Sequence, residues 1–336
     1  LHAGLLQRTA EALVNGEDVT DPWIGYYELG YPLFHYYQHL PYDTLALLFQ
    51  ILGQKISLYV LHKGSMVLLI SLLPASIYLA MRRIGFDDWQ SALAGAASTL
   101  IANNGLFGWD YGSYVWRGFG LYTQVWGMFF MPLALAYGYR TLREGKGYWK
   151  AATLLVVTTL SHIIYGYMIA LTLGMIVFLV PERREILRRL GRLALALAPA
   201  LLALAYFIVP ALLDRAYVNQ SVWDAGLKFD SLGMREIMSA FAKGELFDYG
   251  RAPVLTMLVL AGLLIAVFHR ADERYRLLLA LFGLWLLLYF GRATWGALMD
   301  LIPLTKGLYQ HRFIGGVHLA AIMLIGVALA FPLRLS

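Results

Sequence analysis

Residues 149–180 read WKAATLLVVTTLSHIIYGYMIALTLGMIVFLV and decide the fold class. This run is 32 residues long, and Ser161-His162 interrupts it. A helix rises about 1.5 Å per residue, so about 20 apolar residues are enough to cross the hydrocarbon core of a bilayer. Because the run is long for one crossing, we predict two short membrane helices that meet near Ser161-His162.

The composition extends this prediction to the whole chain. Hydrophobic residues make up 60% of the 336 residues and charged residues only 14%, with a mean hydropathy of +0.61. A soluble domain carries about 25% charged residues. The apolar runs are continuous rather than alternating, which excludes an outer-membrane β-barrel. We therefore predict an all-α, polytopic transmembrane helical bundle that forms one domain over residues 1–336, with the lipid bilayer as its surroundings.

The sequence predicts about nine membrane segments. Besides the two helices within 149–180, the expected segments are 58–80, 89–102, 121–139, 193–213, 253–268, 277–290 and 313–331. Several of them are short for a crossing. The absence of cysteine excludes disulfides, thiolate catalysis and Cys-ligated metals. The chain opens with Leu1 rather than Met, so we expect it to be N-terminally incomplete, with at least one span upstream.

The distribution of basic residues predicts which side of the membrane each loop faces. The net charge is +6, but the basic residues cluster at the ends of apolar segments, which the positive-inside rule explains without nucleic acid as a partner. If 149–180 forms a hairpin, more than half of the 27 Lys and Arg residues fall on one side, which is then cytoplasmic. The loops 21–43, 103–120, 214–252 and 292–312 then face outside, and 214–252 is the longest of them.

The external loop 21–43 is unusually aromatic. It reads DPWIGYYELGYPLFHYYQHLPYD. Pro32 and Pro41 prevent it from crossing a bilayer as a helix. Its tyrosines, among them Tyr36 and Tyr37, either line a groove for sugar rings or an isoprenoid chain, or form a belt at the membrane–water boundary. We interpret the loop as the wall of a site at the membrane face.

The outward loops gather side chains that can carry chemistry. The candidates are Glu28, His35, Asp110, Arg117 and Arg312. Carboxylates beside histidines can bind a hard divalent cation such as Mg²⁺ or Mn²⁺, or act as a general base. An arginine can bind a phosphate with two hydrogen bonds. The alternatives are solvated loop residues, an Asx turn at Asp110 and an interfacial arginine.

His162 stands apart because it interrupts an apolar run. An ionisable group within a membrane segment is costly unless it is paired or faces a polar cavity, which favours a functional role. The alternative is a neutral histidine hydrogen-bonded to a backbone carbonyl at a helix break. Motifs of soluble enzymes such as a Walker loop, GxSxG or HExxH are missing from the sequence.

Several motifs together resemble a known family. They are the helix with His2, Arg8 and Glu11, then Gly16, Asp21-Pro22-Trp23, LGYPLF at 29–34, Tyr36-Tyr37, LPY at 40–42, Ser161-His162, GELFDYGRAP at 244–253 and QHRF at 310–313. The first of these resemble the first external loop of bacterial and archaeal GT-C-like integral membrane proteins. The whole set is more closely similar to the branch labelled 6-pyruvoyl-tetrahydropterin synthase-related membrane protein, a label that implies no pterin chemistry.

The resemblance implies a membrane-embedded glycosyltransferase that takes a sugar from a polyprenyl-phosphate donor at the extracytoplasmic face of the cytoplasmic membrane. It implies a first catalytic acid upstream of Leu1, a few residues before the histidine matched by His2, and a second acid matched by Asp110. The catalytic candidates are Asp110, Glu28, His35 and His162, and the substrate-binding candidates are Arg117, Arg312, Tyr36, Tyr37 and His2. The alternative is a non-catalytic transporter or assembly factor for lipid or polysaccharide on the same scaffold.

Overall fold

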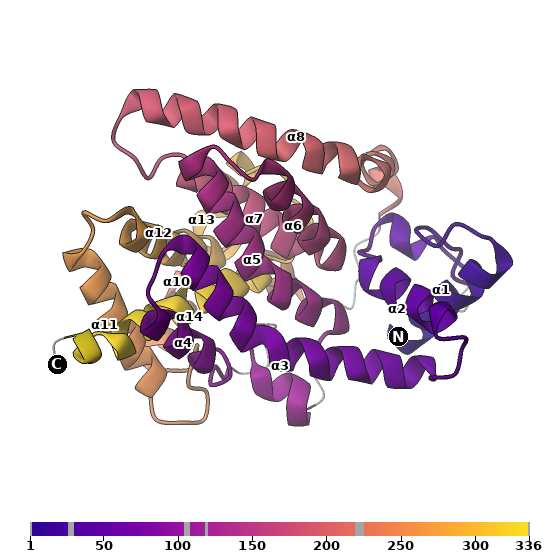
Figure 1. Cartoon of the computed structure of the whole chain (residues 1–336), viewed down its shortest axis with the longest axis horizontal. Helices are drawn as coiled ribbons and strands as arrows, with labels where there is room; N and C mark the ends of the chain where they lie inside the picture. Colours follow the sequence, from indigo (N-terminus) through magenta and orange to yellow (C-terminus); the bar gives the residue numbers. More distant parts are fainter. Residues whose placement is uncertain (1, 26–29, 104–107, 118–119, 219–224, 335–336) are drawn as a thin grey trace.

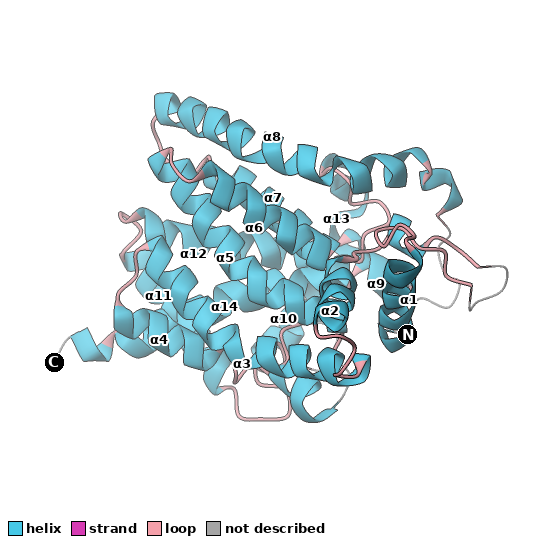
Figure 2. Ribbon diagram, turned by 45° about the vertical axis from the view of Figure 1, so that its right-hand side comes forward, coloured by secondary structure: helices cyan, strands magenta, loops and turns pink. Residues whose placement is uncertain are grey.

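The predicted fold class is confirmed by a computed structural model. The structure describes residues 2–25, 30–103, 108–117, 120–218 and 225–334. Helices dominate these residues, and the extended pairing among them consists of two isolated bridges, Ile24 with Tyr31 and Ala102 with Asp248 (Figure 2). The chain is therefore all-α where it is described.

A helix near the C-terminus forms the core of the bundle. The helical stretch Gln310–Ala330, which ends in α14 (Ile314–Ala330), has an apolar 18-residue segment that is 94% buried. α14 packs against α4 (Asp88–Ala97), α11 (Val254–Phe268) and α12 (Glu273–Tyr289), and it runs through the middle of the molecule (Figure 1). Its glycines and alanines let neighbouring helices approach closely, as at many contacts between membrane helices.

The predicted break in residues 149–180 is present at His162. α5 (Tyr122–Glu144) turns into α6 (Tyr148–Ser161), and α7 (Ile163–Ile176) follows α6 directly. A Cβ atom on Gly166 would lie 2.6 Å from Cα of Thr159. In a straight helix these positions would be about 10 Å apart along the axis. The chain therefore folds back at His162, and α6 and α7 form a tight helical hairpin.

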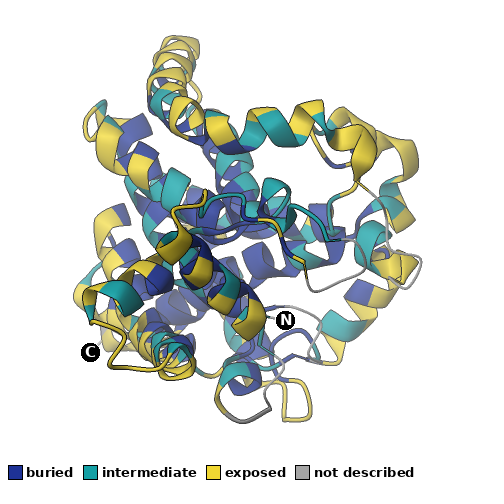
Figure 3. Cartoon of the chain, turned by 90° about the vertical axis from the view of Figure 1, so that its right-hand side faces the viewer, coloured by how far each residue is buried: buried dark blue, intermediate teal, exposed yellow. Residues whose placement is uncertain are grey.

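Two long helices lie on the outside of this core. In α8 (Arg183–Leu213), only 22% of an apolar 18-residue segment is buried. The corresponding share in α3 (Leu58–Ile84) is 39%. In Figure 1, α8 lies along the upper edge of the molecule, and α1 (His2–Asn15) and α2 (Leu40–Ile51) pack together beside the start of α3. Figure 3 shows buried residues in the middle of the bundle and exposed residues around it.

Short helices and turns make up much of the connections. They are Leu33–His35 (η1), the π-helix Ser113–Arg117 (η2), Arg215–Tyr217 (η3), Gly226–Asp230 (α9), Met234–Ala242 (α10), Arg292–Trp295 (α13), Gly296–Leu301 (η4), Gln310–Phe313 (η5) and Pro332–Arg334 (η6). The predicted long loop 214–252 thus contains η3, α9 and α10.

Each of the nine expected segments contains a helix, but nine crossings are not shown. Among the helices that the structure describes, three are long and apolar enough to cross a membrane: Leu58–Ile84, Arg183–Leu213 and Gln310–Ala330. A fourth is possible if Glu273–Tyr289 and Arg292–Leu301, which are bent by 73° at their junction, form one broken span. The count of nine stays a prediction, because helices such as α4, with 10 residues, are short for a bilayer.

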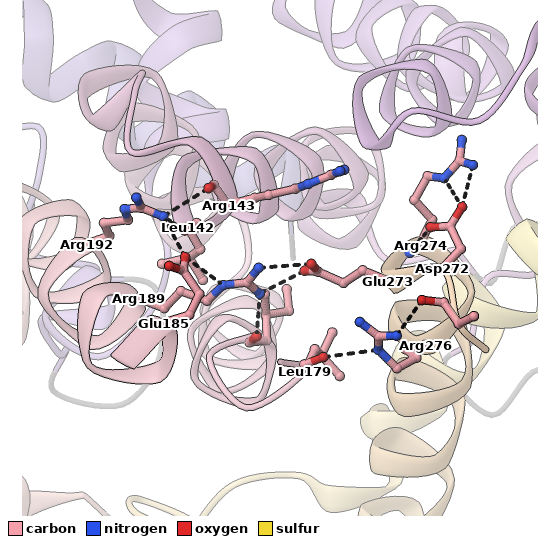
Figure 4. A network of polar contacts seen from close by, with 12 residues as sticks. Leu142, Arg143, Leu179, Glu185, Arg189, Arg192, Asp272, Glu273, Arg274 and Arg276 are labelled. Carbon is pink, nitrogen blue, oxygen red and sulfur yellow. Dashed lines mark hydrogen bonds and ion pairs between the residues drawn. The ribbon is translucent and has the colours of Figure 1, made fainter. Parts of the chain in front are cut away.

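The two ends of the bundle differ in chemistry. At one end an arginine-rich network ties the helices together (Figure 4). Arg189 in α8 is 2% exposed and donates two hydrogen bonds to Glu273 in α12, at 2.8 and 2.9 Å. Arg192 donates to the carbonyl oxygen of Leu142 in α5 at 2.8 Å, and Arg276 to that of Leu179 at 3.1 Å. Basic residues that the sequence assigns to one side therefore meet in space.

The loops assigned to the other side also meet. The guanidinium of Arg251 donates to the carbonyl oxygen of Leu100 at 2.5 Å. The hydroxyl of Tyr167 donates to the carbonyl oxygen of Pro303 at 2.6 Å. His35 in the aromatic loop lies 2.9 Å from Asp214 at the end of α8. We name this the loop end; its location outside the cell stays a prediction.

Candidate functional site

A partly buried polar cluster lies at the loop end, around Arg312 and Gln124. Arg312 belongs to the turn η5, which leads directly into the core helix α14. Its Nη1 atom lies 3.5 Å from Oε1 of Gln124 in α5. The amide nitrogen of Gln124 donates to the carbonyl oxygen of Gly108 at 3.1 Å and to the hydroxyl oxygen of Tyr165 at 2.9 Å. These contacts bring together α5, α7, the loop before α5 and the start of α14.

Four tyrosines lie in the neighbourhood of the Arg312 guanidinium. The phenol groups that interact with it electrostatically are those of Tyr37, Tyr114, Tyr165 and Tyr309. The guanidinium carbon lies 5.8 Å from the centre of the Tyr309 ring. A Cβ atom on Gly315 would lie 2.9 Å from the Tyr165 hydroxyl oxygen, so this glycine lets α14 begin against the ring. Tyrosine hydroxyls can share a bound phosphate or sugar with an arginine.

A second contact holds the aromatic loop in the cluster. The hydroxyl group of Tyr37 lies 3.2 Å from that of Thr123, and the amide nitrogen of Gln38 donates to the same Thr123 oxygen at 2.9 Å. Thr123 neighbours Gln124 on α5. Of the aromatic residues predicted to bind substrate, Tyr37 therefore belongs to this cluster.

His318 fixes the loop that carries Asp110. Its ring is fully buried in α14, where Nδ1 accepts a hydrogen bond from the backbone N–H of Trp109 at 2.8 Å. Nε2 of the same ring donates to the carbonyl oxygen of Leu246 at 2.9 Å. These partners require a neutral histidine with its proton on Nε2. Both loop segments are thus attached to the core helix.

Asp110 is 2% exposed at the edge of the cluster. Its Oδ1 accepts a hydrogen bond from the backbone N–H of Ser113 at 3.3 Å, which is an Asx-type turn at the start of the next helical segment. Asp110 also interacts electrostatically with Tyr114, one of the tyrosines around Arg312. Its geometry therefore contains the Asx turn that the sequence analysis weighed as an alternative, and Tyr114 is a neighbour that it shares with Arg312.

His162 lies close to the cluster, at the hairpin break. It ends α6 and caps α7, where Nδ1 accepts a hydrogen bond from the backbone N–H of Tyr165 at 3.4 Å. The two rings lie 4.3 Å apart. The histidine is thus bonded to the backbone at a helix break, but to an N–H group rather than to the backbone carbonyl of the alternative. It positions Tyr165, and a catalytic role for His162 stays a prediction.

His35 and Tyr36 lie elsewhere on the loop end. His35 bridges two acids, with Nδ1 2.9 Å from Asp21 Oδ2 and Nε2 2.9 Å from Asp214 Oδ2. The hydrogen bond with Asp21 is the main reason that the pKa of His35 is raised, and Asp214 adds to it. The Tyr36 hydroxyl donates to the backbone carbonyl of Asp214 at 3.0 Å. This pair attaches the aromatic loop to the end of α8.

The remaining predicted residues fall in other places. Nδ1 of His2 lies 2.6 Å from the hydroxyl oxygen of Tyr42, in a separate aromatic group formed by α1, α2 and the start of α5. Burial lowers the pKa of the His2 imidazole to about 4. Glu28 lies outside the described residues, as do Tyr26 and Tyr27 of the aromatic loop, and Arg117 is described only by its backbone, at the end of η2.

The expected divalent cation has no evident site in the described part of the chain. Within it, no three His, Asp or Glu side chains converge as metal ligands. His35 has carboxylates on both ring nitrogens, so its hydrogen bonds occupy the atoms a metal would need. We derive no chemical step through a metal.

Sequence reasoning missed Gln124 and His318. Both are polar residues inside expected membrane segments, 121–139 and 313–331. Like His162, each is a polar group in an apolar run and needs a partner, which is the signal that could have found them. Tyr114 and Tyr165 carry no such signal, because tyrosines abound in this sequence.

The fold is similar to that of solved archaeal proteins. One is the oligosaccharyltransferase AglB from Archaeoglobus fulgidus in complex with an inhibitory peptide and a dolichol-phosphate. The two structures superpose with a TM-score of 0.64 at 13% sequence identity, and the match covers 99% of this chain and 46% of that chain. Another is the Archaeoglobus fulgidus oligosaccharyltransferase in complex with Zn and sulfate, with a TM-score of 0.51, 14% identity, and coverage of 99% and 45%. The chain thus spans less than half of these proteins, and at such identities the likeness is one of fold.

The long apolar helices and this likeness define a multi-pass integral membrane protein with a GT-C-like fold. The model of the family described as 6-pyruvoyl-tetrahydropterin synthase related domain, membrane protein, matches residues 34–334. The chain belongs to this family, and the resemblance found in the sequence is confirmed. Among curated proteins, no match to the sequence is found.

Proposed function

We propose that this chain is a membrane-embedded part of a GT-C-type glycosyltransferase that uses a sugar linked to a polyprenyl phosphate. The observation that carries the proposal is the Arg312 guanidinium, held at the start of the core helix beside Gln124 and among four tyrosines. An arginine fixed by its neighbours and flanked by hydroxyl donors suits a lipid-linked phosphate. The similar fold of an oligosaccharyltransferase solved with a dolichol-phosphate supports this choice of ligand.

In the proposed reaction, the acceptor attacks the anomeric carbon of the donor sugar. The bond between that carbon and the phosphate oxygen breaks, and the lipid phosphate leaves with the bonding electrons. The acceptor proton passes to a carboxylate. Asp110 is the candidate for this carboxylate among the residues that the structure describes. Arg312 stabilises the negative charge that grows on the departing phosphate. Tyr37 and Tyr165 contribute hydroxyl groups to the same cluster.

A transfer assay tests the proposal directly. The full-length protein, in detergent or in vesicles, is incubated with radiolabelled polyprenyl-phosphate sugars and a mixture of envelope acceptors. We expect labelled product from the wild type. Arg312→Gln should lower its rate by about 100-fold or more, because the leaving phosphate loses a charge-assisted contact worth about 3 kcal/mol in the transition state. Asp110→Asn should lower the rate through loss of the base.

Two control variants test whether the loss of rate is specific to Arg312 and Asp110 or follows from any loss of charge. Arg215→Gln and Glu236→Gln remove the same charges from exposed positions in the 214–252 segment and should leave the rate unchanged. Absence of transfer by the full-length protein, with Asp110→Asn indistinguishable from the wild type in every assay, would exclude the enzyme and leave the transporter or assembly factor.

A further inference from the structure

A groove crosses the outer surface at the arginine-rich end, away from the candidate site. Its volume is about 450 Å³, and its walls come from α3, α5 and α6. Leu79 of α3 and Leu154 of α6 form opposite sides, and Leu133 and Tyr137 of α5 form the floor between them. One half of the groove is therefore an apolar channel on a surface that a membrane protein presents to lipid.

The other half of the groove is cationic. Arg83, near the end of α3, and Lys150, in the first turn of α6, both line it and are both exposed. The Arg83 guanidinium donates to the Tyr137 hydroxyl oxygen at 3.0 Å and stacks over the Tyr137 ring at 4.6 Å, which fixes its position. Among the described residues, neither cation has an acidic partner; the nearby Asp88 pairs with Arg82 at 3.0 Å.

The first turn of α6 adds to this positive potential. Its N-cap residue is Gly147, which has no side chain to satisfy the free backbone N–H groups. The N-terminus of a helix attracts anions through these groups and through the helix dipole. Trp149, in the same turn and lining the same groove, is 76% exposed. An exposed tryptophan suits the depth of lipid headgroups.

We propose that this groove binds one anionic phospholipid of the surrounding bilayer. Arg83 and Lys150 hold the headgroup phosphate, and an acyl chain lies along Leu79, Leu133 and Leu154. The arrangement matches this ligand at both ends. The two cations, which have no acidic partner among the described residues, lie four residues from Leu79 and Leu154 along their helices. Basic pockets between membrane helices recognise acidic lipid headgroups in this way. The proposal is independent of the glycosyltransferase function.

Native mass spectrometry of the purified full chain tests this proposal. The protein is equilibrated with equal amounts of phosphatidylglycerol and phosphatidylcholine, and the retained lipids are counted. We expect one phosphatidylglycerol bound in preference to phosphatidylcholine. The double variant Arg83→Gln/Lys150→Gln should lower that preference by about tenfold or more. Leu154→Trp, which fills the apolar channel without changing charge, should also release the lipid.

The control is the double variant Arg183→Gln/Arg184→Gln. It removes two exposed cations from the start of α8, at the same end of the bundle but outside the groove. We expect it to keep the bound lipid. Equal losses in both double variants, or retention by Arg83→Gln/Lys150→Gln, would overturn the assignment. Displacement of the lipid by inorganic phosphate alone would also overturn it, because the apolar channel would then contribute nothing.

Discussion

Individual polar residues in this protein differ in what their surroundings allow them to do. His318 and His162 each use Nδ1 to accept a backbone N–H group, so they are held neutral and act as structural connectors. His35 instead lies between two carboxylates, where its charged form is favoured. Arg312 lies among hydroxyl and amide groups that can share an anion with it. These surroundings favour Arg312 and Asp110 among the catalytic and binding candidates, whose roles all stay predictions.

The His35 bridge predicts a pH-dependent link between the aromatic loop and α8. The pKa of His35 is raised in the folded protein, chiefly by Asp21. Its stabilisation is therefore fully present below the unfolded value of about 6.5 and is lost as the pH rises through the raised folded value. We expect the stability gap between the wild type and His35→Gln to be about 1 kcal/mol or less near pH 6 and to vanish at high pH.

Thermal unfolding in detergent between pH 5.5 and 9 measures this gap. His269→Gln is the matched control, because His269 is an exposed histidine at the opposite end of the bundle. A gap that grows with pH, or one of equal size in both variants, would contradict the assigned bridge.

At the scale of elements, the hairpin of α6 and α7 positions the site. The turn at His162 places the start of α7 beside α5, so that Tyr165 reaches Gln124 at 2.9 Å. A straight helix through His162 would carry Tyr165 away from α6, and the cluster around Arg312 would lose one side. The sharp turn requires a residue without a Cβ atom where the helices cross, which is Gly166.

Gly166→Ala should therefore destabilise the protein by about 1–3 kcal/mol, because a Cβ atom there meets the Thr159 backbone at 2.6 Å. Gly174→Ala on the same helix is the matched control, since nothing lies within 4 Å of a Cβ atom at Gly174. The control should be neutral or slightly stabilising. Unfolding midpoints of the two variants give the comparison, and equal midpoints would contradict a close crossing.

At the scale of the molecule, one end of the bundle is basic and rigidly tied, and the other holds the loops and the candidate site. The buried pair of Arg189 and Glu273 joins α8 to α12 at the basic end. The loop end is held by hydrogen bonds such as those of His318 with Trp109 and Leu246. The positive-inside rule predicts that the basic end lies in the cytoplasm and the loop end outside.

Cysteine labelling in whole cells checks this orientation. The sequence has no cysteine, so each introduced thiol is the sole target. Lys243→Cys lies in an exposed position of the 214–252 segment, and Arg184→Cys in an exposed position at the start of α8. A membrane-impermeant maleimide should label Lys243→Cys in intact cells and Arg184→Cys only after permeabilisation. The reverse pattern would place the candidate site in the cytoplasm.

Most of the fold class was accessible from local patterns. Apolar runs predict helices wherever they occur, and the helix break at Ser161-His162 follows from a polar pair in a run that is long for one crossing. The family likewise follows from short motifs along the chain. The number of membrane crossings does not follow from the sequence. A short apolar helix has the same sequence pattern whether it spans a bilayer or packs inside the protein.

The candidate site depended on contacts that are remote in sequence. Arg312 and Gln124 are 188 residues apart, and Trp109 and His318 are 209 apart. Tyr36 and Tyr37 are neighbours in the chain, yet one contacts Asp214 and the other Thr123. By itself, then, the sequence determined an all-helical membrane protein, its basic side and its family, since hydropathy and charge act locally. Only the tertiary structure decided which polar groups share a site, because burial leaves a polar side chain only the partners that packing brings to it.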